Sequence, residues 1–180
     1  MKKVISLIIC MLFISACSKK VSSVDVVKNY LDNYVNLSSS VKSDLKKVIN
    51  ENDEFNDENK DMYKKLLEKQ YKDLKYTILT EEYDDDISLI TVNIEVYDLN
   101  ASEKIASDYL SKNLKEFYNE DNVFDNHKYI NYKLDLMYND SPRINYSLIF
   151  SLKRKNNEWI LEKPTNEDLE KIHGIYKNNS

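Results

Sequence analysis

The spacing of apolar residues divides the chain into a helical first part and a second part that mixes strands with helices. Apolar side chains recur every three or four residues over 24–36, 40–51 and 60–71, which predicts three amphipathic helices. Ser22 and Asp25 fit a capping box at the start of the first helix. After the third helix the period changes to two, which is typical of antiparallel strands with one buried face.

The second part of the chain predicts two strand pairs with helices between and after them. Residues 119–142 fit either a helix or a strand, and we favour a helix. Asn156-Asn157 suits a tight turn and Gly174 suits a helix end, because both positions tolerate left-handed backbone. Trp159 should be largely buried against the preceding strand or the first helix. The other expected elements are strands at 74–78 and 90–96 around an acidic turn at 81–86, a helix capped by Asn100 and Glu103 that buries Ile105, Tyr109, Leu110, Leu114 and Phe117, strands from Ile144 to Leu152 and after the Asn-Asn turn, and a helix over 166–173.

This order of elements predicts an α+β fold in which N-terminal helices pack on a curved antiparallel sheet. The chain is long enough for one such domain, which we place at 24–176.

The first residues have the pattern of a secretory signal peptide. Lys2 and Lys3 precede a short apolar run over 4–16 that is too short to span a bilayer. The run ends in Ile-Ser-Ala-Cys at 14–17, which resembles the lipobox of bacterial lipoproteins. The resemblance implies cleavage after residue 16 and a lipid on the thiol of Cys17, with 17–23 as a tether; an ordinary secreted protein is the alternative.

Cysteine use and charge narrow the possible functions. Cys10 lies in the signal segment, so the exported chain keeps Cys17 alone and has no internal disulfide or cysteine-rich zinc site. Without Lys2 and Lys3 the chain has 24 basic and 31 acidic residues, a net charge of about −7, which disfavours nucleic acid as a partner. The expected location is the outer face of the bacterial cytoplasmic membrane.

Several segments are similar to small bacterial lipoproteins of the nuclear-transport-factor-2-like superfamily. They are the leading amphipathic helix, a long alternating strand that ends in Lys-Arg-Lys-Asn-Asn-Glu, the following Trp-Ile-Leu-Glu-Lys, and a closing Leu-Glu-Lys-Ile-His-Gly-Ile-Tyr. The resemblance covers about 24–176 and implies a cone-shaped α+β domain with a pocket at its open end. A cystatin-like arrangement is the competing architecture, because the helical insertion at 100–142 departs from the simplest cone.

The sequence offers few groups for catalysis or metal binding. A single glycine excludes phosphate-binding loops, and we expect His127 and His173 to be exposed or structural. The acidic run at 81–86 is typical of a solvated turn. Four residues have the spacing of calcium-loop ligands, but Met62 replaces the required glycine and the same stretch can start a helix. These four residues are Asp57, Asn59, Asp61 and Glu68.

We therefore expect no cofactor and no metal, and a non-enzymatic module that binds an envelope protein, a peptide or a small ligand. The alternative is a small lyase or isomerase that uses a carboxylate and a tyrosine, as some cone-shaped relatives do. Asp98 and Tyr146 are the candidates for that role, although we favour structural roles for both, with Asp98 capping a strand end before the Asn100 helix and Tyr146 packing in the core.

Overall fold

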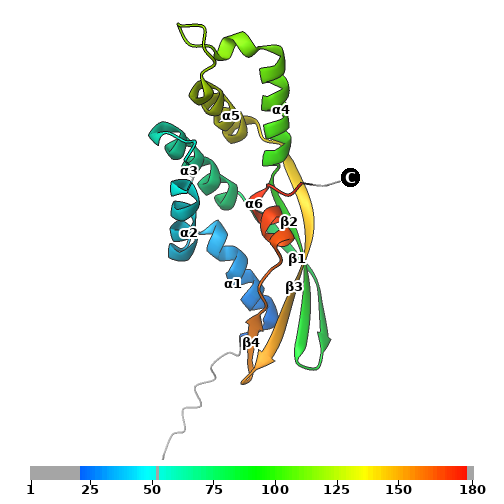
Figure 1. The fold of residues 1–180 in the computed structure, drawn as a ribbon. Helices are drawn as coiled ribbons and strands as arrows, with labels where there is room; N and C mark the ends of the chain where they lie inside the picture. The colour runs from blue at the N-terminus through cyan, green and yellow to red at the C-terminus, as the bar shows by residue number, and fades with distance from the viewer. Residues whose placement is uncertain (1–20, 52, 178–180) are drawn as a thin grey trace, which may run out of the picture.

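The computed structural model describes residues 21–51 and 53–177, and within them the chain has an α+β fold. The predicted signal peptide, Cys17 and most of the predicted tether lie outside the described residues. No helix within the described ranges is long and apolar enough to cross a bilayer. The elements, shown in Figure 1, are α1 (Ser23–Val35), α2 (Ser39–Asn50), α3 (Asp57–Lys72), β1 (Lys75–Asp84), β2 (Ile87–Tyr97), α4 (Leu99–Lys112), the 3₁₀ helix η1 (Leu114–Phe117), α5 (Asn126–Asp140), β3 (Arg143–Lys155), β4 (Glu158–Leu161) and α6 (Asn166–His173).

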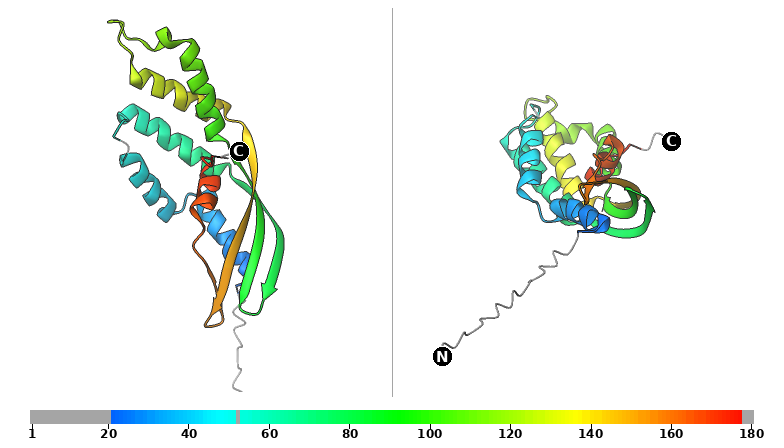
Figure 2. Two further views of the ribbon diagram at one scale, coloured as in Figure 1. Left: turned by 45° about the vertical axis from the view of Figure 1, so that its right-hand side comes forward. Right: turned by 90° about the horizontal axis from the view of Figure 1, so that it is seen from below.

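The four strands form one open antiparallel sheet in the order β1-β2-β3-β4. Alternate residues of β2, from Ser88 to Val96, are buried on the inner face, as the period of two predicts. The inner residues of β3 pair with them, for example Ile144 with Val96 and Phe150 with Ile90. The helices cover this face only, so the outer face of the sheet is open to solvent (Figure 2).

The inner face of the sheet is closed by α1 and α6. Val27 and Leu31 of α1 and Ile172 of α6 are fully buried among the inner residues of β2 and β3. The capping box of Ser22 and Asp25 starts α1 as predicted. The space inside the curved sheet is therefore a packed core.

α4 and α5 form the end of the molecule that lies away from the strand tips, and α2 and α3 lie between this end and α1 (Figure 1). The predicted helix within 119–142 is present as α5, and its buried residues are Ile130, Leu134 and Met137. Tyr129 and Tyr132, which we expected in the buried stripe, are half-buried and contact the ring of Phe117.

Two local predictions are wrong. The first hairpin turns at Asp85-Asp86, because residues 81–84 of the acidic run belong to β1. The start of α4 is capped by Asp98, whose side chain accepts a hydrogen bond from the backbone N–H of Ala101, and Asn100 lies inside the helix.

The buried face of α4 also differs from the prediction. Leu99, Ser102 and Ala106 are buried, whereas Ile105 and Leu114 are 49% and 45% exposed. The buried stripe follows the earlier helix start, and it packs against α5 and the end of β2.

Trp159 is half-buried, which is less than expected. It packs at the border of the main core, with the guanidinium of Arg154 4.7 Å from its ring centre and the ring of Tyr83 6.0 Å away. The preceding turn is as predicted, since Asn156 and Asn157 have φ of 50° and 67°.

Candidate functional site

The first turn of α4 is fixed by three segments that are far apart in the sequence. Asp98 caps the helix through Ala101, and the backbone N–H of Asp98 donates to the carbonyl of Pro142 at 2.8 Å. The N–H of Leu99 donates to the carbonyl of Gly174 at 2.9 Å. The start of α4 is thus held between the beginning of β3 and the segment that follows α6.

Asn100 is left without its predicted capping role. Its Nδ2 is buried, and this donor has no hydrogen-bond partner within residues 21–51 and 53–177. An unpaired buried amide donor costs about 1–3 kcal/mol, so most such groups in native proteins have a partner. A residue that carries such an unpaired donor and also lines a surface hollow is a candidate for contact with a ligand.

Asn100 and Glu103 lie where three hollows meet, and we call the three together the α4 cleft. Their volumes are about 220, 470 and 760 Å³. The whole cleft runs from the space between α3, α4 and α5 to the surface beside β3, α6 and residues 175–177. The two larger volumes lie in the range that is common for small-molecule pockets.

The smallest hollow is the apolar end of the cleft. Glu103 and Lys133 stand at its rim with their charged atoms 3.7 Å apart. The hollow suits one apolar side chain, because its volume is below the range of drug-sized pockets. Its other lining residues are Phe55, Tyr63, Leu66, Leu99, Asn100, Leu134, Met137 and Ile175.

The two candidates for proton transfer, Asp98 and Tyr146, both line the 470 Å³ hollow. Burial raises the pKa of Tyr146, and the nearby charges of Asp98 and Tyr176 raise it further. The phenol therefore stays protonated at neutral pH and can donate a hydrogen bond. Asp98 caps α4, so one of its oxygens already serves the helix.

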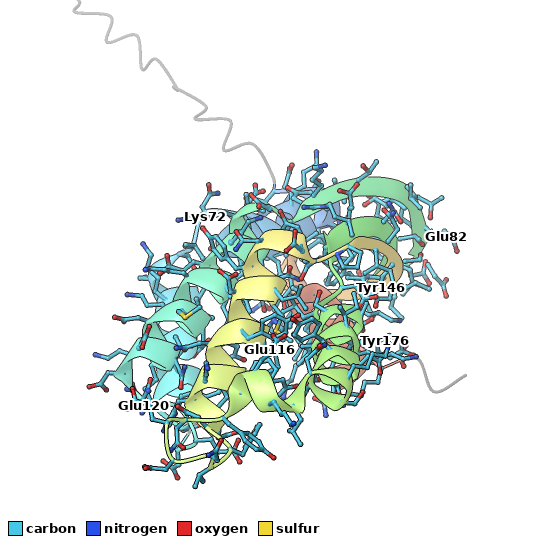
Figure 3. The ribbon with its side chains drawn as sticks, turned by 90° about the horizontal axis from the view of Figure 1, so that it is seen from above. Lys72, Glu82, Glu116, Glu120, Tyr146 and Tyr176 are labelled. Carbon is cyan, nitrogen blue, oxygen red and sulfur yellow. The ribbon has the colours of Figure 1, made fainter. Side chains whose placement is uncertain are left out.

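Tyr146 and Tyr176 make the aromatic wall of this hollow. Their ring centres are 5.7 Å apart in an edge-to-face arrangement. Figure 3, which looks down on the α4–α5 end, shows both side chains on the same side of the molecule beside α4. No sequence pattern distinguishes Tyr176, which follows the last helix and is one of fourteen tyrosines.

The residues with calcium-loop spacing all lie in α3, so this stretch is a helix. Asn59 is buried, and its amide contacts Asn131 and, at 3.2 Å, Nδ1 of His127. Asn59 therefore ties α3 to α5. In the described parts of the chain, no three His, Cys, Asp or Glu side chains gather where they could hold a metal ion.

A further hollow of about 630 Å³ lies between α2 and α3, and no pattern in the sequence points to it. Leu45 and Ile49 form its apolar part. Lysines and acids alternate around it, so it has no clear charge preference. The charged lining residues are Lys42, Lys46, Asp57, Lys60, Asp61, Lys64 and Glu68.

Comparisons with known proteins identify no family for this chain. It matches no family model and no curated protein. One solved structure, of a candidate lipoprotein (ycdA) from Bacillus subtilis, is 14% identical with a TM-score of 0.40, and the match covers 87% of this chain and 48% of that one. The chain thus spans about half the length of that protein, and so low a TM-score does not establish a common fold. The nuclear-transport-factor-2-like resemblance stays a prediction.

Proposed function

We propose that the chain is an extracytoplasmic lipoprotein, anchored through Cys17, whose domain binds a ligand in the α4 cleft without catalysing a reaction. The observation that carries the binding role is Asn100, which lines all three hollows and whose buried Nδ2 has no partner among the described residues. The inner face of the sheet supports the same view, because buried side chains of α1 and α6 pack against the centre of β2 and β3.

The position of the proposed anchor fits this role. The hydroxyl of Ser23 in the first turn of α1 bonds the carboxylate of Glu81 and lies 3.3 Å from the hydroxyl of Tyr83, close to the tip of the first hairpin. Ser22, which caps α1, follows Cys17 by five positions, so the two lie at most about 17 Å apart. A lipid on Cys17 would therefore keep the strand tips near the membrane, with α4 and α5 at the opposite end (Figure 1).

Mass spectrometry of the protein purified from membranes tests the anchor. We expect an acylated amino terminus at Cys17, and an uncleaved, unlipidated precursor for Cys17→Ser. A wild-type amino terminus at any other residue would contradict the lipoprotein assignment.

Nuclear magnetic resonance tests the binding role. The exported chain with Cys17→Ser, labelled with ¹⁵N, would be titrated with a library of small amides and peptides, and the Asn100 side-chain NH₂ resonances give a direct readout. Ligands should shift these resonances and should lose affinity for Asn100→Ala. Binders that leave Asn100 unaffected would contradict the proposed site.

A lyase or isomerase is the second candidate, because Asp98 and Tyr146 line the same hollow. Asp98→Asn separates the two functions, since Asn caps a helix as well as Asp but cannot accept a proton as a base. Ligand binding that survives this change without any conversion of the ligand by the wild type favours the binding module.

A further inference from the structure

β3 extends well beyond its shorter neighbour. It pairs with β2 from Arg143 to Lys153, but with β4 only from Leu152 to Lys155. β4 ends at Leu161, and Pro164 follows soon after, where a backbone without an N–H cannot continue the ladder. Within the described residues, the first half of β3 therefore has a strand partner on one side only (Figure 1).

Two hydrogen bonds show which backbone groups face the open side. The N–H of Arg154 donates to the carbonyl of Asp86 on the β2 side, and the carbonyl of Ser151 accepts from Glu162 on the other side. Because these directions alternate along a strand, the odd-numbered residues of β3 face away from β2. Asn145, Ser147 and Ile149 thus present N–H and C=O groups that bond to no other part of residues 21–51 and 53–177.

The open edge borders the α4 cleft. Ile144 and Tyr146, which alternate with the edge residues and point to the inner face, line the 470 Å³ hollow together with Ala101, Lys104 and Asp108 of α4. α4 lines the same hollow as these inner-face residues, and we call this side of the cleft, between α4 and the start of β3, the groove. The unpaired N–H and C=O groups of the neighbouring edge are the groups to which the backbone of an extended segment can bond.

The residues around the groove indicate which side chains a bound strand should carry. Those on the inner side would meet Ile144, Tyr146 and Tyr176, and those on the outer side would meet the exposed Asn145 and Ser147. Alternating apolar and polar residues match these surroundings. A free sheet edge beside a pocket is a general means of binding an extended peptide.

We infer that the α4 cleft binds an extended peptide segment, which adds as a fifth strand to the free edge of β3 and places its apolar side chains beside Tyr146 and Tyr176. This inference rests on the proposed function and specifies the ligand class of the same site.

Peptides selected from a phage-displayed random library against the Cys17→Ser exported chain serve as the probe. Ser147→Pro removes one edge N–H and puts the proline ring on the open side, while the pairing with β2 keeps its hydrogen bonds. Ser147→Ala is the matched control, because it removes the hydroxyl and keeps the N–H. We expect affinity to fall about tenfold or more in Ser147→Pro and to change little in Ser147→Ala. Circular dichroism of both variants reports whether the fold is kept.

Amide hydrogen exchange gives a readout that needs no variant. In the free protein the amides of Asn145, Ser147 and Ile149 should exchange fast, while those of Tyr146 and Leu148 are protected by β2. The bound peptide should protect the first three. Edge amides that are already protected in the free protein would overturn the inference and point to residues 178–180 or a second copy as the occupant.

The outcomes separate the inference from the function on which it rests. Peptides that lose affinity in Asn100→Ala but not in Ser147→Pro would refute strand addition and leave the cleft as a binding site. Peptides insensitive to both changes would refute both proposals. If the library yields no binder while small amides still shift Asn100, the extended-peptide class is wrong.

Discussion

The hydroxyl of Tyr71, on α3, lies 2.9 Å from Nδ1 of His173, on α6. The imidazole is largely enclosed, with the rings of Tyr34 and Tyr71 at 6.1 and 5.6 Å between centres. His173 thus joins the last helix to α1 and α3, and it is a structural histidine of the kind the sequence analysis expected.

Stability should depend on pH through this contact. Burial lowers the pKa of His173 from its ordinary value of 6.5, because the charged imidazolium is poorly solvated there. As pH falls below 6.5 the unfolded chain binds a proton before the folded chain does. The free energy of unfolding should therefore be constant above that pH and fall below it, by at most about 1.4 kcal/mol per pH unit.

Urea denaturation at pH 7.5 and pH 5.5 measures this difference. His173→Gln is the control, since it can still accept a hydrogen bond from Tyr71 but does not titrate. The lowered pKa of Asp73, caused first by its bond to Lys69, affects stability only below its ordinary value of 3.8, outside this range. An equal loss of stability in wild type and His173→Gln would show that another group is responsible.

The cap of α4 leads to a second prediction. Asp98→Ala should lower the free energy of unfolding by about 1 kcal/mol, because the N–H of Ala101 loses its acceptor. Asp98→Asn should be nearly neutral, since Asn caps equally well. Thermal unfolding of the two variants checks the order. Equal losses would mean that the charge of Asp98 matters more than its capping bond.

The start of α4 could not be predicted from the local sequence alone. Asp98 and Asn100 are both good capping residues, and Asn100 has Glu103 at the offset of a capping box. Backbone hydrogen bonds to the carbonyls of Pro142 and Gly174 decide which of the two caps the helix, and these residues lie 44 or more positions after Asp98 in the chain. Ser22 and Thr165 each have an acid at the capping-box offset, Asp25 and Asp168, which their neighbours Ser23 and Asn166 lack, and both helices start there.

In the sheet, too, some features follow from the local sequence and others depend on tertiary contacts. The strand pairs follow from the period of two, and the left-handed Asn156 and Asn157 follow from turn preference. The free edge of β3 could not be predicted, because it depends on how soon β4 ends relative to its partner. The residues of the candidate site were therefore predicted only in part. Asp98 and Tyr146 were predicted as candidates for catalysis, whereas no sequence pattern marked Asn100 and Tyr176 as binding residues.

The half-buried Trp159 gives a third prediction. Complete burial would make Trp159→Ala cost about 3–5 kcal/mol. Because one side of the ring is covered by Arg154 and Tyr83 at the edge of the core, we expect about 1–3 kcal/mol. Leu148→Ala, in the centre of the same sheet face, should cost more. Denaturation of both variants and quenching of the single tryptophan's emission measure this; a fully protected Trp159 would contradict the observed packing.

The last prediction concerns Gly174, the only glycine, which ends α6 with φ of 73°. Left-handed backbone explains only part of its need for glycine, because a Cβ at this position would lie 2.1 Å from the carbonyl oxygen of Tyr97 and 2.5 Å from Nε2 of Gln70. Gln70 is itself fixed, since its Oε1 accepts from the N–H of Tyr97 at 3.1 Å. There is thus no space for a side chain between α6 and the end of β2.

Two substitutions distinguish crowding from backbone strain. At an ordinary left-handed helix end Asn is tolerated and Ala costs about 1–2 kcal/mol. At Gly174 we expect Ala and Asn to destabilise the protein alike and by more than that, because both carry the Cβ that meets the Tyr97 carbonyl. The same carbonyl closes β2 just before Asp98, so both variants should also disturb the start of α4 and the environment of Asn100. Thermal unfolding and the Asn100 NH₂ resonances measure the two effects. A stable Gly174→Asn variant with unchanged Asn100 resonances would show that the contact with Tyr97 can relax without affecting the cleft.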